Sequence, residues 1–264
     1  MKKVLGVLFI LFLITYFGFL GNGTSAWGVT ITVRTREQLV TGGFRPISNV
    51  RVDAHHPAGT FEDRKNFEIY DTKYTDINGE CRLEVPEGKR FDIVAFKRGF
   101  FPENLRDMNS SSLGIFASGI DINMYRTPTR SIPTIPRESI VARFKVLVSA
   151  WGSLEDIKLN RGFIPVQGAT VFAFYKRTGV DTGEDYQGWR VYFKGLTNRN
   201  GEVEVPIIDK LINDPQNKYD DNLFIFSTSK ADYLYLFPSA VAPVTQFLEN
   251  ARTGQYSALH FLKP

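Results

Sequence analysis

The strongest constraint on the fold is an internal repeat. Residues 75–86 read TDINGECRLEVP, and residues 197–206 read TNRNGEVEVP. Further blocks around this pair recur in the same order, so chance similarity is a poor explanation. They match residues 43–54 with 162–173, 91–100 with 224–233, and 119–128 with 256–264. The sequence therefore predicts two copies of one folding unit.

The repeated blocks have the chemistry of short β-strands. Residues 29–35 (VTITVRT) alternate apolar and polar side chains strictly, and residues 143–148 (RFKVLV) do so in part. Alternation with a period of two places one face of a strand against a core. The 22 Phe and 11 Tyr favour the same class, because aromatic side chains suit half-buried sheet surfaces. We expect an all-β fold, with one helical turn at 209–213 and a short helix at 243–252.

Each copy of the repeat contains an Asn-Gly pair, at residues 78–79 and 200–201. Glycine accepts a positive φ without steric cost, and asparagine tolerates it better than most residues. An Asn-Gly pair between alternating runs is a strong hairpin signal, so both pairs are predicted to be hairpin turns. After the first turn, Cys81, Leu83 and Val85 fall on one face, which predicts a core position for the only cysteine. A single cysteine excludes an intrachain disulfide.

The first 26 residues have the pattern of a signal peptide. Lys2 and Lys3 precede an uncharged apolar run over residues 4–20, and Thr24 and Ala26 suit a cleavage site. An uncleaved membrane anchor is the alternative, because the run is near the short limit for a membrane span. Either outcome exports the rest of the chain. We expect a secreted or cell-surface protein that contacts the membrane only through this segment, if it is uncleaved.

The charge of the exported chain is close to balanced. Without Lys2 and Lys3, the 32 basic residues become 30, against 28 acidic residues, which leaves a net charge of +2. The chain also has no long run of lysine and arginine. A basic surface is what nucleic-acid binding requires, so we expect no nucleic-acid partner.

The repeat and the leader predict four segments. Residues 1–26 are the signal peptide, 27–128 the first β-sandwich domain, 129–138 a proline-rich linker, and 139–264 the second β-sandwich domain. Three prolines between residues 126 and 136, with little periodicity around them, predict an extended, semi-rigid linker. Each unit has about the length and the turn spacing of a seven-stranded sandwich.

The order of the motifs resembles a known module. It runs P-[IV]-x-x-[AV]-x-V, T-[DN]-x-[ND]-G-E, V-P and K-x-[GD]-[FY] in both units. This order is similar to the carboxypeptidase regulatory-like domain and to the repeat B modules of bacterial collagen-binding adhesins. The resemblance covers most of both units and implies two tandem transthyretin-like Greek-key β-sandwiches. Its motifs are turns and inward hydrophobic residues, so it implies fold rather than function.

The resemblance also raises the question of an internal crosslink. The adhesin modules often carry a Lys–Asn isopeptide bond between their first and last strands. Unit one has Asn123 in its last strand but no lysine in residues 29–35. Unit two has Lys145 in its first strand but no asparagine in residues 256–264. We therefore expect no such crosslink in either unit.

The sequence lacks the motifs of common catalytic sites. The histidines are His55, His56 and His260, and none belongs to an H-x-x-E or H-E-x-x-H pattern of a metallopeptidase. His55 and His56 are predicted to end a strand and enter a loop, and His260 to lie on the solvent face of the last strand. G-x-S-x-G and phosphate-binding glycine loops are also missing from the sequence. We expect no enzymatic activity.

Aromatic residues of the second unit are candidates for ligand binding. Trp151, Tyr186 and Trp189 offer flat apolar faces with a polar group, which suits stacking on sugar rings. Tyr186 and Trp189 belong to a stretch, residues 174–195, that is longer than its counterpart in unit one. The alternative role for these side chains is to cover the edge of the sandwich or to pack one domain against the other.

The acidic loop at residues 214–222 is the candidate metal site. Asp214, Asp220 and Asp221 supply the oxygen ligands that Ca²⁺ prefers. A solvated acidic turn is the alternative. Apart from this calcium site, we expect no cofactor.

These features together predict an exported, non-catalytic structural or adhesive protein. Sandwiches have open strand edges that can pair with another chain, so the expected partners are the protein itself or other surface proteins. The alternative is an extracellular carbohydrate- or peptide-binding module that uses the aromatic residues of the second unit. Its partner would be an extracellular glycan or peptide.

Overall fold

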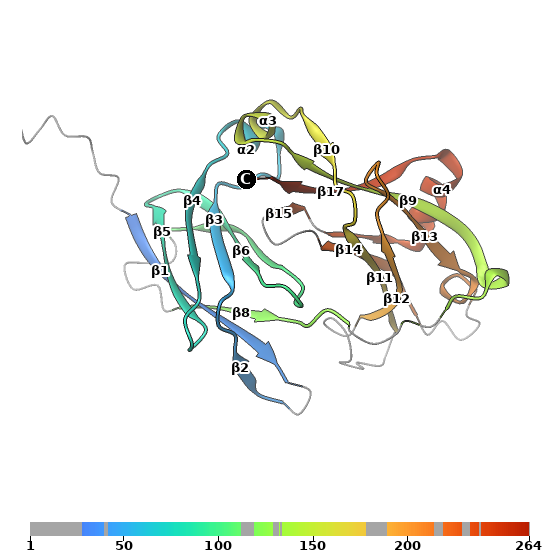
Figure 1. The fold of residues 1–264 in the computed structure, drawn as a ribbon, viewed down its shortest axis with the longest axis horizontal. Helices are drawn as coiled ribbons and strands as arrows, with labels where there is room; N and C mark the ends of the chain where they lie inside the picture. The colour runs from blue at the N-terminus through green and yellow to red at the C-terminus, as the bar shows by residue number, and fades with distance from the viewer. Residues whose placement is uncertain are drawn as a thin grey trace, which may run out of the picture.

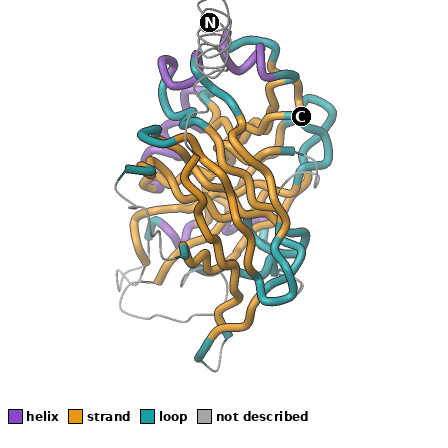
Figure 2. The backbone as a smooth tube through the Cα atoms, turned by 90° about the vertical axis from the view of Figure 1, so that its left-hand side faces the viewer, coloured by secondary structure: helices purple, strands orange, loops and turns teal. Residues whose placement is uncertain are grey.

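The computed structural model describes residues 28–39, 42–111, 119–128, 132, 134–177, 189–213, 219–228, 233–237 and 239–263. These residues form an all-β protein, as the strand periodicity predicts, with strands filling the middle of the molecule (Figures 1 and 2). None of the helices in these ranges has the length and apolar character needed to cross a membrane.

The first half of the chain forms two four-stranded sheets. In one sheet, β1 (Gly28–Gln38) pairs antiparallel with β2 (Phe44–Pro46) and β5 (Glu80–Pro86), and parallel with β8 (Ile120–Met124). The other sheet has the order β4 (Ile69–Tyr74), β3 (Arg51–His55), β6 (Arg90–Phe96), β7 (Glu103–Asn109).

The second half repeats this arrangement. Its first strand, β9 (Ile140–Trp151), pairs antiparallel with β10 (Phe163–Pro165) and β13 (Glu202–Ile208), and parallel with β17 (Tyr256–Leu262). Strand β15 (Leu234–Phe237) adds to β17. The other sheet has the order β12 (Arg190–Leu196), β11 (Thr170–Arg177), β14 (Tyr219–Thr228), β16 (Ser239–Pro243). Strands that occupy equivalent positions in the two halves pair with equivalent neighbours. The domain boundaries and the transthyretin-like topology stay predictions.

Each pair of sheets encloses an apolar core, built by the alternation that the sequence shows. In β1 and β5, every second side chain is buried. They meet buried side chains of the facing strands β3 and β6; this core includes Ile31, Val33, Leu83, Val85, Val52, Ala54, Phe91 and Ile93. Cys81 is 8% exposed in the same core, and burial raises the pKa of its thiol to about 11. The core position predicted for Cys81 is confirmed.

The two Asn-Gly turns connect sheets, so the prediction of hairpins was wrong. The first turn joins β4 to β5 and the second joins β12 to β13, and in each case the two strands belong to different sheets. Asp76 Oδ1 accepts hydrogen bonds from the backbone N–H groups of Asn78 and Glu80, each at 2.9 Å. Asn198 makes the same two bonds in the second half. The turn chemistry is local, but the burial of each strand's apolar face decides which sheet it joins.

Gly79 and Gly201 bring each turn into backbone contact with the first strand of its half. The Thr35 N–H donates to the Gly79 carbonyl at 2.8 Å, and the Val148 N–H donates to the Gly201 carbonyl at 2.7 Å. A Cβ on Gly79 would lie 2.5 Å from the Thr35 carbonyl oxygen, and one on Gly201 would lie 2.3 Å from that of Val148. Both glycines also have positive φ, 76° and 74°. A side chain at either position is therefore disfavoured both by the short contact of its Cβ and by the positive φ.

The threonine that begins each copy of the turn sequence adds a second set of contacts. Thr75 Oγ1 donates to the Ile47 carbonyl at 2.9 Å and accepts from the Val50 N–H at 3.0 Å. Thr197 Oγ1 makes the equivalent bonds in the second half, at 2.5 Å and 2.9 Å. Both hydroxyls are buried, so the bonds satisfy backbone groups that water cannot reach.

The chain also forms short helices between the strands. The 3-10 turn η2 (Asp209–Leu211) and helix α4 (Val244–Thr253) lie where the sequence predicts them, and another 3-10 turn, η1 (Arg137–Ser139), precedes β9. Helices α2 (Phe61–Lys65) and α3 (Leu154–Leu159) were not predicted. Each begins after a threonine or serine, Thr60 or Ser153, that accepts the N–H of the third helical residue. This capping pattern is visible in the sequence, but helices this short leave no periodic signal.

The halves meet through two apolar contacts around the β3–β6 sheet, which lies between β1–β5 and the second half in Figure 1. Phe101 is fully buried, with its ring 5.5 Å from the rings of both Phe172 and Phe174. Val94 and Phe96 of β6 belong to the core of the second half. The other contact combines side chains from both halves: Ala58, Phe67, Trp151, Ile157, Leu236 and Leu262. Apolar burial therefore joins the halves at both ends of this sheet.

The close contact at Gly201 predicts a specific stability loss. Gly201→Ala should lower the free energy of unfolding by roughly 2–5 kcal/mol, because it adds overpacking to a disfavoured φ. Gly254→Ala is the matched control, since Gly254 has φ 70° and a Cβ there would meet no atom within 4 Å beyond its chain neighbours. It should cost only about 1–2 kcal/mol. Urea unfolding measures both, and equal losses would contradict the role of the contact.

The contact of the halves predicts a loss at Phe101. Phe101→Ala should lower the free energy of unfolding by about 3–5 kcal/mol, since it removes a buried ring that joins the halves. Phe44→Ala is the control, because Phe44 is 50% exposed, and surface changes of this kind usually cost about 0.5 kcal/mol. Urea unfolding of both variants checks this, and a loss below that of Phe44→Ala would refute it.

Candidate ligand-binding site

A cavity of about 390 Å³ opens between residues of α2, β17 and the end of α3. These three elements lie in the upper part of Figure 1. Gly59 and Arg64 line it from the first half, and the second half contributes Trp151, Asn160, Phe163 and His260. Its volume falls within the range of small-molecule sites, about 300–1,000 Å³. The cavity therefore exists only because the halves meet here.

Three rings form one wall of this cavity. The ring centroids of Trp151 and Phe163 are 5.0 Å apart, and each lies 5.1 Å from the imidazole of His260. Strand pairing sets this arrangement, because Phe163 of β10 pairs directly with Trp151 of β9. Trp151 is 1% exposed, whereas Phe163 is 43% exposed. Phe163 is thus the ring of this wall that a ligand reaches most easily.

His260 lies on the face of β17 opposite Leu259 and Phe261, which are fully buried in the core. His260 therefore lies on the face away from the core, as predicted, but the rings of Trp151 and Phe163 leave it only partly exposed there. Ser149 Oγ lies 2.9 Å from His260 Nδ1 and makes a hydrogen bond with it. Burial, and to a smaller extent the nearby charge of Arg64, lowers the pKa of His260 to about 4. The imidazole is therefore neutral at physiological pH.

The cavity has hydrogen-bond donors without partners. Arg64 Nη1 donates to the Ala58 carbonyl at 3.2 Å, but Arg64 Nε is buried and makes no hydrogen bond to the described residues. The indole N–H of Trp151 is in the same situation. Buried donors are nearly always paired in folded proteins. Both atoms belong to residues that line the cavity, but each atom is itself buried, so neither faces the open space of the cavity.

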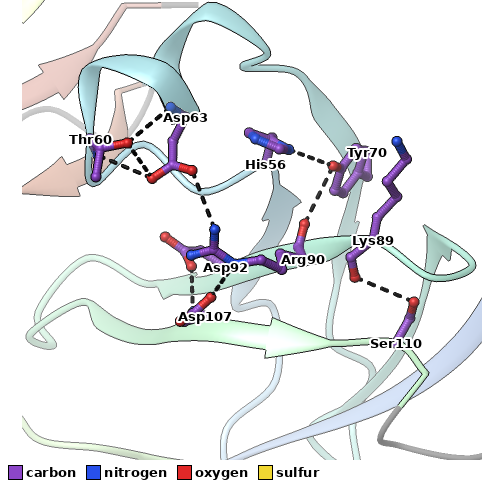
Figure 3. A network of polar contacts seen from close by, with 9 residues as sticks. All are labelled: His56, Thr60, Asp63, Tyr70, Lys89, Arg90, Asp92, Asp107 and Ser110. Atoms are coloured by element: carbon purple, nitrogen blue, oxygen red, sulfur yellow. Dashed lines mark hydrogen bonds and ion pairs between the residues drawn. The ribbon is translucent and has the colours of Figure 1, made fainter.

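A polar network fixes helix α2, and with it Arg64 (Figure 3). Asp63 Oδ2 accepts hydrogen bonds from the Thr60 hydroxyl at 2.8 Å and the Thr60 N–H at 3.1 Å. These bonds, led by the hydroxyl, lower the pKa of Asp63 despite some desolvation. Asp63 Oδ1 accepts from Arg90 of β6 at 3.4 Å, and Arg90 donates to Asp107 of β7 at 2.5 Å. The network ties the helix to the sheet, so the residue that follows Asp63 has a fixed place in the cavity.

Two histidines hold the loop between β3 and α2 in place. His55 ends β3 and His56 enters the loop, as predicted. His56 Nδ1 lies 3.0 Å from the Tyr70 hydroxyl, and burial raises the pKa of Tyr70 to about 12 (Figure 3). The His55 ring is buried against Phe67 at 5.3 Å, and burial lowers its pKa. These contacts are structural, since both histidines are used to anchor the loop.

The pair Ser149 and His260 does not have the geometry of an activated nucleophile. Ser149 is 3% exposed, so a substrate cannot reach its hydroxyl. No carboxylate among the described residues is hydrogen-bonded to the His260 ring. A histidine whose pKa is about 4 is also a weak base at neutral pH. The cavity is therefore suited to binding rather than to nucleophilic catalysis.

The other aromatic candidates lie elsewhere. Trp189 packs against Phe224, with ring centroids 5.8 Å apart, in the apolar cluster around Phe101. Trp151 belongs to the other cluster between the halves. Tyr186 lies outside the described residues. The predicted stacking role of all three stays a prediction, although Trp151 does line a cavity.

The calcium prediction is also open. Asp214 lies outside the described residues, and Asp220 and Asp221 belong to β14, where the structure describes the backbone of these positions only. Among the side chains that the structure does describe, no three His, Cys, Asp or Glu residues are grouped to hold a metal ion.

The residues of the hypothetical crosslink have other partners. Lys145 Nζ pairs with Glu202 Oε1 at 3.1 Å, and Asn123 Oδ1 accepts a hydrogen bond from Arg36 at 2.9 Å. Both contacts link neighbouring strands of one sheet. The two residues therefore act as ordinary cross-strand partners.

Comparison with known proteins gives only remote likenesses. The sequence matches no family model and no curated protein. The shaft pilin SpaA from Lactobacillus rhamnosus GG aligns at 10% identity over 90% of this chain and 98% of that chain, with a TM-score of 0.25. The minor pilin GBS52 from the Gram-positive pathogen Streptococcus agalactiae aligns at 10% identity over 89% and 96%, with a TM-score of 0.27. TM-scores this low do not establish a common fold.

The partly buried imidazole of His260 predicts a pH-dependent stability. The pKa of His260 is lower in the folded chain than in the unfolded chain, where it is about 6.5. Its contribution to the free energy of unfolding is therefore fully present above pH 6.5. This contribution, up to about 3 kcal/mol, is lost as the pH falls toward 4. Urea unfolding at both ends of this range measures the loss in the wild type and in His260→Gln, where it should be smaller.

The control for this experiment is His56→Gln. His56 also has a hydroxyl partner and a pKa that burial lowers, but the shift is smaller than that of His260, and His56 lies outside the cavity. This variant should keep most of the wild-type loss on acidification. If both variants show the same loss as the wild type, burial of His260 does not control the acid response.

Proposed function

We propose that the protein is an exported, non-catalytic structural or adhesive component that acts at the cell surface or outside the cell. The leader pattern at residues 1–26 supports export. The body of the protein supports a mechanical role, because apolar contacts on both sides of the β3–β6 sheet hold the two halves together. The observation that carries the proposal is the pair of edge strands in the second half.

The sheet β12–β11–β14–β16 ends in two edge strands that expose apolar side chains. Leu196 of β12 is 66% exposed, and Val241 of β16 is 57% exposed. Edge strands usually carry charged residues or proline, because an open edge with apolar side chains promotes pairing with another chain. Pairing of such edges adds backbone hydrogen bonds between molecules. We therefore propose that copies of the protein, or other surface proteins, associate through these edges.

Location tests the first part of the proposal. Antibody detection in fractionated cells should find the protein in the medium or on the cell surface. N-terminal sequencing of a cleaved form should begin near Trp27, after Ala26. Recovery of the protein from the cytosol would overturn the export proposal.

Assembly tests the second part. Light scattering of the purified wild type should show a mass that rises with concentration, and Val241→Lys should reduce this rise, because a charged edge residue opposes strand pairing. Ile77→Lys is the matched control. Ile77 is 82% exposed in the turn before β5, so the change removes apolar surface without touching an edge strand. A monomeric wild type, or equal effects of both variants, would refute association through these edges.

A further inference from the structure

The cavity between the halves has a chemistry that indicates a ligand class. We propose that it binds an acidic sugar, a saccharide ring that carries a carboxylate. The proposal does not depend on export or on edge pairing. It names a ligand for the cavity lined by Arg64, Trp151, Asn160, Phe163 and His260.

The charge of the lining calls for an anion. Among the residues that the structure describes, Arg64 is the charged member of the lining, and none of the lining side chains is acidic. Its nearest acidic neighbour in the sequence, Asp63, is already bound to Thr60 and Arg90. Burial is the main cause of the lowered pKa of His260, and the positive charge of Arg64 lowers this pKa further. An anion in the cavity would relieve this unbalanced charge.

The donor geometry favours a carboxylate. Arg64 lines the cavity and is anchored through Nη1 on the Ala58 carbonyl. The planar guanidinium group offers parallel N–H donors that match the two oxygens of a carboxylate. Arginine donates only, so the ligand must supply the acceptors.

The rest of the lining favours a sugar ring over an aliphatic or peptide side chain. The lining contains no aliphatic side chain: besides Arg64 and Gly59, it consists of three rings and one amide. The half-exposed ring of Phe163 offers a flat apolar face, on which the C–H face of a sugar can stack. Asn160, at the C-terminal end of α3, brings an amide that can bond to hydroxyl groups. This mixture of flat rings and polar groups matches a polyhydroxylated ring with one acidic group.

Binding of glucuronate to the full-length protein tests the proposal. Calorimetry should show saturable binding of glucuronate with a Kd below about 10 mM, and binding of glucose at least about tenfold weaker. Acetate, which has the carboxylate without the ring, should also bind at least about tenfold more weakly. NMR should show the largest shifts for the ring of His260. Shifts that fall outside the cavity lining would overturn the site.

Variants separate the site from general attraction between charges. Arg64→Gln should weaken glucuronate binding by at least about tenfold, and Arg64→Lys should weaken it less. Arg98→Gln is the matched control, because Arg98 lines a different cavity beside Phe100 and Phe172. It should leave the affinity unchanged. Phe163→Ala, at an exposed ring, should also weaken binding, and it keeps the test valid if Arg64→Gln fails to fold.

Several results would overturn the proposal. One is the lack of saturable glucuronate binding up to about 10 mM, and another is equal affinity for glucuronate and glucose. Equal losses in Arg64→Gln and Arg98→Gln would show that the effect is not local. Tighter binding of N-acetyl-phenylalanine than of glucuronate would assign the cavity to a peptide carboxylate instead.

Discussion

The fold depends on a backbone contact between each Asn-Gly turn and the first strand of its half. The Gly79 and Gly201 carbonyls accept the N–H groups of Thr35 and Val148, at 2.8 Å and 2.7 Å. At these two points the first strand changes partner, from β5 to β2 in one half and from β13 to β10 in the other. The turn supplies the hydrogen bond that the strand would otherwise lose at the change. The sheet can therefore continue without an unpaired backbone group.

This contact between the turn and the first strand explains why the chain repeats a turn sequence so closely. The threonine hydroxyl bonds two backbone groups of the loop before β3 or, in the second half, before β11. The side chain of the next residue accepts a hydrogen bond from a backbone N–H within the turn. The glycine permits the approach to the first strand. Each position of the motif thus has a separate contact, and the same set occurs in both halves. The strands on either side of the turn then enter opposite sheets and enclose the core.

The contact between the halves creates the features that belong to neither half alone. The β3–β6 sheet has apolar side chains on both faces, so it serves as a wall for both cores. Helices α2 and α3, one from each half, meet beside this sheet and bring Arg64 next to the rings of Trp151, Phe163 and His260. A partly buried guanidinium group thus comes to line one cavity together with three rings. Binding chemistry arises here from the meeting of two structural units.

The sequence alone predicts the strand class, the duplication and the turn residues, because these depend on local periodicity and on the φ values that Asn-Gly allows. It also placed Cys81 in the core, since alternation fixes which face is buried. It failed on the pairing across the turns, because the choice of sheet depends on burial of distant strands. Arg64, Phe163 and His260 carry no shared sequence signal. Only the tertiary structure decided that they meet, because contacts between residues far apart in the chain depend on how the two halves pack.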